Sequence, residues 1–388
     1  MRIAMIVFNT TGEGTYWRAY HLGRVLAKAG HEVTLMATSP RNRWQFSESQ
    51  TEGMTLVEAP DALWGPLRSG WDPWNTLRRI GWMKARRFDF VHAFEARPTV
   101  IFPALAARRL GAKLVIDWAD LFGKSGSVEE RPEILRRLLL RPVETYFETH
   151  YRRGADAQTA INRALAARAR GLAAPGTPVL HLPNGCDASL PLLERAAARR
   201  ALGIAAQARL VGMVGGLFDR DAQLMAEAWT GLAARDPDAR LVLAGNSGRH
   251  ILRHVEHLPR VERLGRMSAE QLHAHVSACD LLWLPLCANE ANRGRMPLKV
   301  NNYLATGRPT VMTDVGETAE LISRLRAGVV AQAEPAALAE ATLALLNNEA
   351  LKAELGSNAR RAAEGVCEWG VLAQDLDSFY REVLESAQ

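Results

Sequence analysis

The chain has 388 residues, of which 48% are hydrophobic and 23% charged; this is typical of a globular protein of two or three domains and excludes a largely disordered chain. The formal net charge of +6 favours anionic partners such as phosphate-bearing substrates, acidic membranes or nucleic acid, although a GC-rich genome, which raises arginine content, explains the excess equally well. No apolar stretch approaches the ~20 residues of a membrane span.

The first residues and the cysteines predict a cytoplasmic protein. Met1 leads directly into a strand-like segment, without the apolar core of a secretory signal. The four cysteines show no C-x-x-C spacing, which disfavours a zinc or redox site and suits a reducing compartment. We therefore expect a cytoplasmic location, with peripheral attachment to the inner face of the membrane as an alternative.

The first half of the chain predicts a doubly wound α/β sheet. An apolar strand at 3–8, a glycine-containing loop, a helix at 16–29 and a strand at 31–37 form the β-α-β unit of such sheets. The alternation continues with strands expected at 88–92, 113–117, 157–160 and 179–182, and helices at 99–110, 132–153 and 162–170.

A second, similar half begins near Leu210 with a strand at 210–214. Two consecutive α/β sheets predict the α/β class with two Rossmann-like, doubly wound domains that face each other across a cleft. We place these domains at 1–190 and 191–370. Further strands are expected at 239–244, 281–285 and 310–313, and helices at 222–234, 269–278, 298–305, 335–347, 349–364 and 372–386.

Seven short segments carry a resemblance to a known family. They are GHEVTLMA at 30–37, RRGADAQTAIN at 152–162, LPNGCD at 182–187, LVLAGN at 241–246, ERLGRMSAEQL at 262–272, ACDLLWLPL at 278–286 and PLKVNNYLATGRPTV at 297–311. Their order and spacing resemble those of GT-B glycosyltransferases, especially the retaining group called GT4, over nearly the whole chain.

The resemblance implies a division of labour between the domains. The first would bind the acceptor, the second would bind a UDP-, GDP- or dTDP-linked sugar, and a C-terminal helix at 371–388 would pack back on the first. It implies transfer of the sugar to a hydroxyl, with retention, without a bound metal and with no cofactor beyond the donor substrate. The leaving diphosphate would assist the attack, so that the protein positions groups and stabilises charge.

A basic segment before the helix at 298–305 is the expected site of the donor phosphates. Arg293 and Arg295 offer forked donors, and Lys299 offers a point charge at the start of that helix. A solvated basic loop is the simpler alternative. The family often has two glutamates in this region, at the positions of Gly294 and Asn302.

The missing glutamates weaken the expected ribose site. Asn302 keeps a hydrogen-bond acceptor without the charge, and Glu290 either replaces the first carboxylate or is simply exposed. Arg220 either supplies a cation that relatives carry elsewhere or lies on the surface.

Glycines complete the expected donor site. Gly215 and Gly216 let the backbone approach a phosphate closely, and Gly265 with Arg266 matches the turn that borders the nucleotide base in the family. The loop at 9–15, which contains Gly14, resembles the family's glycine-rich loop, although a tight turn into a helix explains its glycines almost as well.

Two strand ends in the first half carry the catalytic candidates. Glu95 follows one strand, and Asp117 and Asp120 follow the next in an Asp-x-x-Asp-Leu pattern that matches a subgroup of relatives. Asp120 or Glu95 is expected to orient or deprotonate the acceptor hydroxyl. Capping of a following helix is the alternative for Asp120. His92 is expected to be a core residue.

The acceptor is expected to be a glycan, a lipid-linked molecule or a small molecule, and nucleic acid is not expected because no recognition module is visible. Tryptophans and arginines alternate in the segment 71–87, which suits contact with an anionic bilayer, whereas a helix packed on the sheet is the simpler interpretation. A nucleotide-sugar 2-epimerase and a non-catalytic sugar-nucleotide- or glycan-binding protein remain alternative functions.

Overall fold

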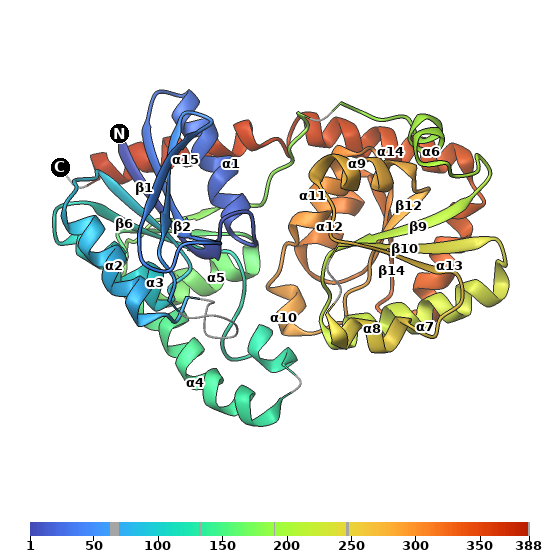
Figure 1. Ribbon diagram of the computed structural model, residues 1–388, viewed down its shortest axis with the longest axis horizontal. Helices are drawn as coiled ribbons and strands as arrows, with labels where there is room; N and C mark the ends of the chain where they lie inside the picture. The colour runs from blue at the N-terminus through green and yellow to red at the C-terminus, as the bar shows by residue number, and fades with distance from the viewer. Residues whose placement is uncertain (63–69, 132, 190, 246–247, 387–388) are drawn as a thin grey trace. The chain divides into compact units, whose positions relative to one another are not determined.

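The computed structural model describes residues 1–62, 70–131, 133–189, 191–245 and 248–386. The chain divides into two compact units, each built on its own sheet (Figure 1). Unit 1 consists of Met1–Asn184 and Trp369–Gln388, and unit 2 of Gly185–Glu368. The chain therefore passes from one unit to the other after Asn184 and again after Glu368, a few residues before the predicted boundaries at 190 and 370.

Unit 1 is organised around an eight-stranded sheet with the order β3-β4-β2-β1-β5-β6-β7-β8. Neighbouring strands pair in parallel, except that β3 runs antiparallel to β4. The central strands are buried and apolar, as expected for parallel strands covered on both faces. The strands are β1 (Arg2–Thr10), β2 (Glu32–Thr38), β3 (Ser47–Thr51), β4 (Met54–Ala59), β5 (Phe90–Phe94), β6 (Lys113–Trp118), β7 (Ala157–Ala160) and β8 (Val179–His181).

The helices of unit 1 include one from the far end of the chain. In Figure 1 the C-terminal helix α15, drawn in red, runs beside α1, drawn in blue. Tyr380 of α15 hydrogen-bonds to the buried His92, with 2.7 Å between its Oη and Nδ1, and Trp369 stacks on His21. The helices are α1 (Tyr16–Lys28), α2 (Pro73–Lys84), α3 (Pro98–Arg108), α4 (Ile134–His150), α5 (Arg163–Leu172) and α15 (Trp369–Glu385), with 3-10 turns η2 (Ser127–Glu130) and η3 (Tyr151–Gly154).

His92 is a core residue, as predicted. Its side chain is fully buried, and its Nε2 lies 3.1 Å from Thr159 Oγ1. Burial lowers the pKa of His92 to about 4, so the ring is neutral at physiological pH.

Unit 2 is a parallel six-stranded sheet with the order β11-β10-β9-β12-β13-β14. Its strands are β9 (Arg209–Val214), β10 (Ala239–Ala244), β11 (Val261–Gly265), β12 (Leu281–Leu284), β13 (Thr310–Thr313) and β14 (Gly328–Ala331). Its helices are α6 (Arg195–Leu202), α7 (Asp219–Arg235), α8 (Arg249–Val255), α9 (Ala269–Ala278), α10 (Glu290–Arg293), α11 (Leu298–Ala305), α12 (Gly316–Leu325), α13 (Pro335–Leu346) and α14 (Glu349–Glu364).

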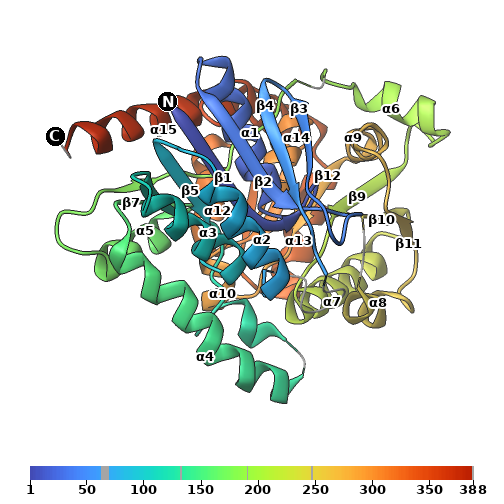
Figure 2. The ribbon, with the colours of Figure 1, turned by 60° about the vertical axis from the view of Figure 1, so that its left-hand side comes forward.

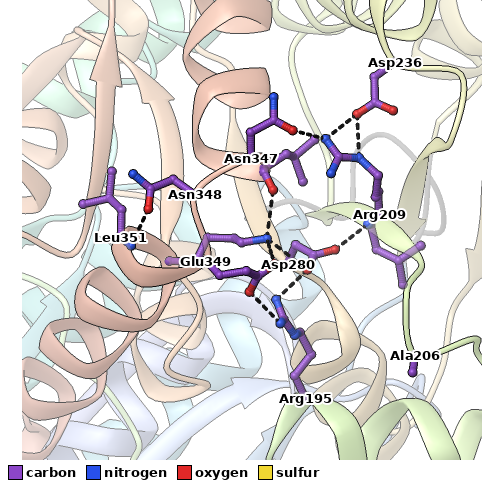
Figure 3. A network of polar contacts seen from close by, with 12 residues as sticks. Arg195, Ala206, Arg209, Asp236, Asp280, Asn347, Asn348, Glu349 and Leu351 are labelled. Carbon is purple, nitrogen blue, oxygen red and sulfur yellow. Dashed lines mark hydrogen bonds and ion pairs between the residues drawn. The ribbon is translucent and has the colours of Figure 1, made fainter.

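A network of ion pairs fastens helices to the amino end of this sheet (Figure 3). Arg195 of α6 contacts Asp280, at 2.6 Å, and Glu349 of α14, at 2.9 Å. Asp280 directly precedes β12 and also accepts a hydrogen bond from the Leu210 amide. A cavity of about 620 Å³ lies beside this network. Arg199 and Lys352 also pair with Asp280, and Lys352 pairs with Glu349 as well. Because each of these cations has a carboxylate partner within the network, we assign the network to structural support.

Candidate functional site

Three glycines with left-handed backbone lie at the carboxyl ends of neighbouring strands in unit 2. Gly215, Gly245 and Gly265 follow or end β9, β10 and β11, with φ angles of 74°, 99° and 67°. The Gly245 amide donates to the Gly265 carbonyl at 2.8 Å, and a Cβ on Gly245 would lie 3.2 Å from the Gly215 nitrogen. These loops therefore pack backbone against backbone, as only glycine permits without strain.

Lys299 reaches this glycine edge from the first turn of α11. Its Nζ donates to the Gly216 carbonyl at 2.7 Å, and it lies 3.9 Å from where a Cβ on Gly215 would stand. Burial, together with the nearby Arg295, lowers the pKa of Lys299 to about 7. The ammonium is thus poorly compensated, and a bound anion would stabilise its charged form.

Arg295 adds a second cation beside Lys299. Its guanidinium lies over the Phe218 ring, 4.2 Å from the centroid, and donates to Asn292 Oδ1 at 3.0 Å. Asn292 in turn donates to the buried Asp221 at 2.8 Å, and Asp221 Oδ2 lies 3.8 Å from Arg295. One carboxylate thus faces two cations, and the cluster of Gly215, Gly216, Asp221, Arg295 and Lys299, which we call the cationic cluster, has an excess of positive charge.

The other predicted donor residues of unit 2 are exposed. Glu290 and Arg293 form an exposed ion pair with each other, at 2.6 Å. The remaining three lie apart from this pair: Arg220 in the first turn of α7, Arg266 beside Gly265, and Asn302 on α11. Their roles in donor binding stay predictions.

In unit 1, Asp117 is held entirely by protein groups. The guanidinium of Arg18 makes two bonds to it, at 3.0 and 2.9 Å, and Thr159 donates a third hydrogen bond to it. Arg18 also donates to the carbonyls of Leu182 and Pro183. Asp117 is fully buried, and despite this burial the contacts with Arg18 keep its pKa below the ordinary value. This geometry favours a structural role over the predicted catalytic one.

Glu95 is also buried, and it holds the loop after β6. Its Oε1 accepts hydrogen bonds from the amides of Ala119 and Asp120, at 2.7 and 3.0 Å. Its backbone has a φ of 75°, which is strained for a residue with a side chain. Burial raises the pKa of Glu95 well above its usual value, against the opposing effect of Arg152, 3.7 Å away. Glu95 is therefore placed to position Asp120.

Asp120 is the half-exposed member of the three predicted carboxylates. Its Oδ1 accepts a hydrogen bond from the amide of Leu121 at 2.9 Å. The described chain after Asp120 enters a loop and not a helix, so the alternative of helix capping is wrong. Among the three predicted carboxylates, Asp120 is thus the one that is accessible to solvent, and its contact with an acceptor stays a prediction.

Gly14 lies in the loop between β1 and α1, as predicted. Its φ is 56°, and a Cβ there would clash with the side chain of Asn9. Asn9 Oδ1 accepts a hydrogen bond from the Thr15 amide at 3.1 Å and so fixes the loop at the start of α1. The turn into the helix explains this glycine, and contact with the donor stays a prediction.

Sequence reasoning missed three charged residues that organise these sites. Asp221 falls in the first turn of α7, where an acidic residue is ordinary. Arg18 lies in an amphipathic helix, and the sequence pattern does not indicate that its side chain is buried. Glu148 of α4 accepts hydrogen bonds from the amides of Phe122 and Gly123, and thereby fixes the loop after Asp120. The partners of Arg18 and Glu148 are distant in sequence, and no local pattern reveals them.

Among the described residues, no three His, Cys, Asp or Glu side chains gather as they would around a metal ion. In the same part of the chain, no helix has both the length and the apolar character needed to span a membrane. Metal independence of the reaction stays a prediction.

Comparisons with known proteins agree for both halves of the chain. The family model "Glycosyltransferase Family 4" matches residues 13–190, and "Glycosyl transferases group 1" matches residues 208–348. No curated protein matches.

Solved structures of similar fold span nearly the whole chain. Sucrose-phosphate synthase from Thermosynechococcus elongatus has a TM-score of 0.78 at 18% identity, and covers 100% of both chains. WaaG, a glycosyltransferase involved in lipopolysaccharide biosynthesis, has a TM-score of 0.72 at 18% identity, over 97% of this chain and 99% of WaaG. Anabaena HepE, solved with UDP and glucose, has a TM-score of 0.71 at 15% identity, over 98% of this chain and 100% of HepE. These likenesses confirm the predicted α/β class with two Rossmann-like domains of the GT-B type.

Proposed function

Because this chain is a glycosyltransferase of group 1, similar to family 4, we propose that its donor is a nucleoside diphosphate sugar. The observation that carries this proposal is the cationic cluster at the carboxyl ends of the strands of unit 2. In open α/β sheets this edge is where ligands bind. The donor is UDP-, GDP- or dTDP-linked, and UDP is the first to test, since the similar HepE was solved with it.

The cationic cluster suits a diphosphate in charge and in shape. Lys299 and Arg295 supply two cations against the single carboxylate of Asp221. The bare backbone at Gly215 and Gly216 leaves room for phosphate oxygens close to Lys299. A diphosphate would therefore neutralise charge that the protein itself leaves uncompensated.

We further propose that transfer proceeds with retention and without a metal ion, and that Asp120 contacts the acceptor hydroxyl. Two observations support the role of Asp120: it is half-exposed, and Glu95 fixes its backbone by a hydrogen bond. Arg295 and Lys299 would stabilise the negative charge that develops on the leaving diphosphate. The acceptor is a glycan, a lipid-linked molecule or a small molecule.

A binding experiment tests the donor site. The wild-type chain is titrated calorimetrically with UDP-, GDP- and dTDP-sugars, after a thermal-shift screen in which a ligand at 100 times its Kd adds about 2.7 kcal/mol of stability. Lys299→Met and Arg295→Met are each expected to weaken binding about tenfold or more, because each removes a charge-assisted contact.

The matched control is Arg240→Met, which removes an exposed cation near the opposite end of β10. It should leave the affinity unchanged. Equal affinity of all three variants for the donor would contradict the proposed phosphate site. Incubation of the bound donor with acceptors, followed by mass spectrometry, then separates transfer to an acceptor from epimerisation of the donor and from binding without reaction.

A further inference from the structure

Helix α4 presents a broad apolar face to solvent. Six large hydrophobic side chains on it are 40–72% exposed, and they recur every one to four residues along the helix. Both views of the ribbon show α4 at the rim of unit 1 (Figures 1 and 2). These side chains, which we call the α4 face, are Ile134, Leu135, Leu138, Leu139, Val143 and Tyr146.

The opposite side of α4 is the side that packs on unit 1, and it carries the acids. Glu144 is buried and pairs with Arg97 at 3.0 Å. Glu148 is buried and accepts hydrogen bonds from Trp118 and the following loop. Phe147 packs between Trp71 and Phe102. This is the reverse of an ordinary surface helix, which buries its apolar side and exposes its charges. The packing of α4 on unit 1 therefore does not account for the apolar side chains of the α4 face.

The residues around the α4 face are basic. Arg137 and Arg141 lie on the same helix and are half-exposed, and they share the single carboxylate of Glu129, at 4.0 and 3.0 Å. Lys124 and Arg153, which lie before and after α4 in sequence, are exposed. Against these four cations stand Glu129, Glu130 and the exposed Glu133, all near the amino end of α4. With Glu144 and Glu148 turned inward, the fringe of the α4 face keeps a small excess of positive charge.

The segment 71–87, which the sequence offered for membrane contact, is arranged differently. Helix α2 buries Trp82, Met83 and the guanidinium of Arg79, which donates to the Val7 carbonyl at 2.7 Å. Among the described residues of that segment, Leu77 is the one large hydrophobic side chain that is strongly exposed, at 65%. A single exposed leucine does not make an apolar face.

We propose that the α4 face docks unit 1 onto an anionic lipid surface. Apolar side chains would enter the boundary between headgroups and acyl chains, while Arg137, Arg141, Lys124 and Arg153 meet the negative headgroups. A second copy of this chain suits the face less well, since a symmetric contact brings the same arginines close to one another. The proposal rests on α4 alone and does not depend on the identity of the donor.

Vesicle sedimentation with the full-length chain tests this proposal. The wild type is expected to bind vesicles of equal parts phosphatidylglycerol and phosphatidylcholine, and to bind phosphatidylcholine vesicles about tenfold less tightly or worse. The double variant Leu135→Gln/Leu139→Gln should lose about tenfold or more of the binding to the anionic vesicles. Its melting temperature should not fall, because both side chains are exposed.

The matched control is Leu77→Gln on α2, which should bind as the wild type does. Three results would overturn the proposal: no binding of the wild type to anionic vesicles, full binding by the double variant, or an equal loss in Leu77→Gln. A wild-type dimer in light scattering that the double variant abolishes, without vesicle binding, would instead assign the face to a second copy.

Discussion

The charged clusters at the two strand edges use their charges in opposite ways. In unit 2, Lys299 and Arg295 share one buried carboxylate, and the pKa of Lys299 falls to about 7 because burial and the like charge of Arg295 outweigh the attraction of Asp221. In unit 1, Asp117 is matched by the guanidinium of Arg18, which keeps the pKa of this buried carboxyl below its ordinary value. Charge left uncompensated indicates a ligand, whereas charge that is fully paired indicates internal support.

The largest expected effect concerns the support in unit 1. Arg18→Ala should lower the free energy of unfolding by about 3–5 kcal/mol, since Asp117 would remain buried without its cation. Urea denaturation followed by circular dichroism measures this. Lys28→Ala, on the same helix but in an exposed pair with Glu52, should cost less than about 1 kcal/mol. If both variants cost the same, Asp117 is not a structural clamp, and its predicted catalytic role regains weight.

Asp120→Asn should lower kcat for transfer about 100-fold, because the amide keeps the hydrogen bond from Leu121 but cannot accept the acceptor proton. Glu95→Gln keeps the oxygen that holds Ala119 and Asp120, so kcat should fall less than about tenfold. Steady-state kinetics of both variants, with melting curves as a check on folding, compare them. The reverse order would mean that Glu95, and not Asp120, meets the acceptor.

Donor affinity should depend on pH through Lys299. The pKa of Lys299 is about 7 in the free protein, and a bound diphosphate would raise it. The contribution of the ammonium is thus complete below pH 7 and is lost as the pH rises above it, by roughly tenfold between pH 6 and pH 8. Calorimetry over this range with a nucleoside diphosphate sugar measures the slope. Lys299→Arg, which stays protonated, should give a flat profile; equal slopes would exclude Lys299 as the source.

The smallest effect is expected at the exposed pair of Glu290 and Arg293. Glu290→Gln should change donor affinity less than about fivefold, since exposed pairs contribute little. A loss of tenfold or more in the same titration would instead show that Glu290 replaces the missing family glutamate in binding the ribose.

Much of the fold could be predicted because apolar runs are separated by glycine and proline. The helices at 269–278 and 298–305 and the strand at 310–313 have the predicted bounds. The hairpin strand β3, with the sequence SESQT, was missed because it is exposed and polar and lacks an alternating pattern. The edge strand β11 was missed for a similar reason, since its burial is only partial.

The location of several candidate site residues could be predicted from the sequence. Gly216 and Lys299 lie far apart in sequence, yet both were expected in the donor site, and the structure joins them by a hydrogen bond. Burial was not predictable in the same way. Asp117 follows a strand just as a catalytic residue would, and its enclosure depends on Arg18 turning inward from a helix 99 positions away.

The return of α15 to unit 1 has a consequence for biosynthesis. Unit 2 is continuous in sequence, whereas unit 1 lacks α15, which follows unit 2 in the chain, until that helix has left the ribosome. Trp369 and Tyr380, which cover His21 and His92, therefore arrive after all of unit 2 has been translated. Unit 2 can therefore complete its folding as soon as it has been synthesised. Unit 1 is synthesised earlier, but part of its core stays uncovered until α15 is added.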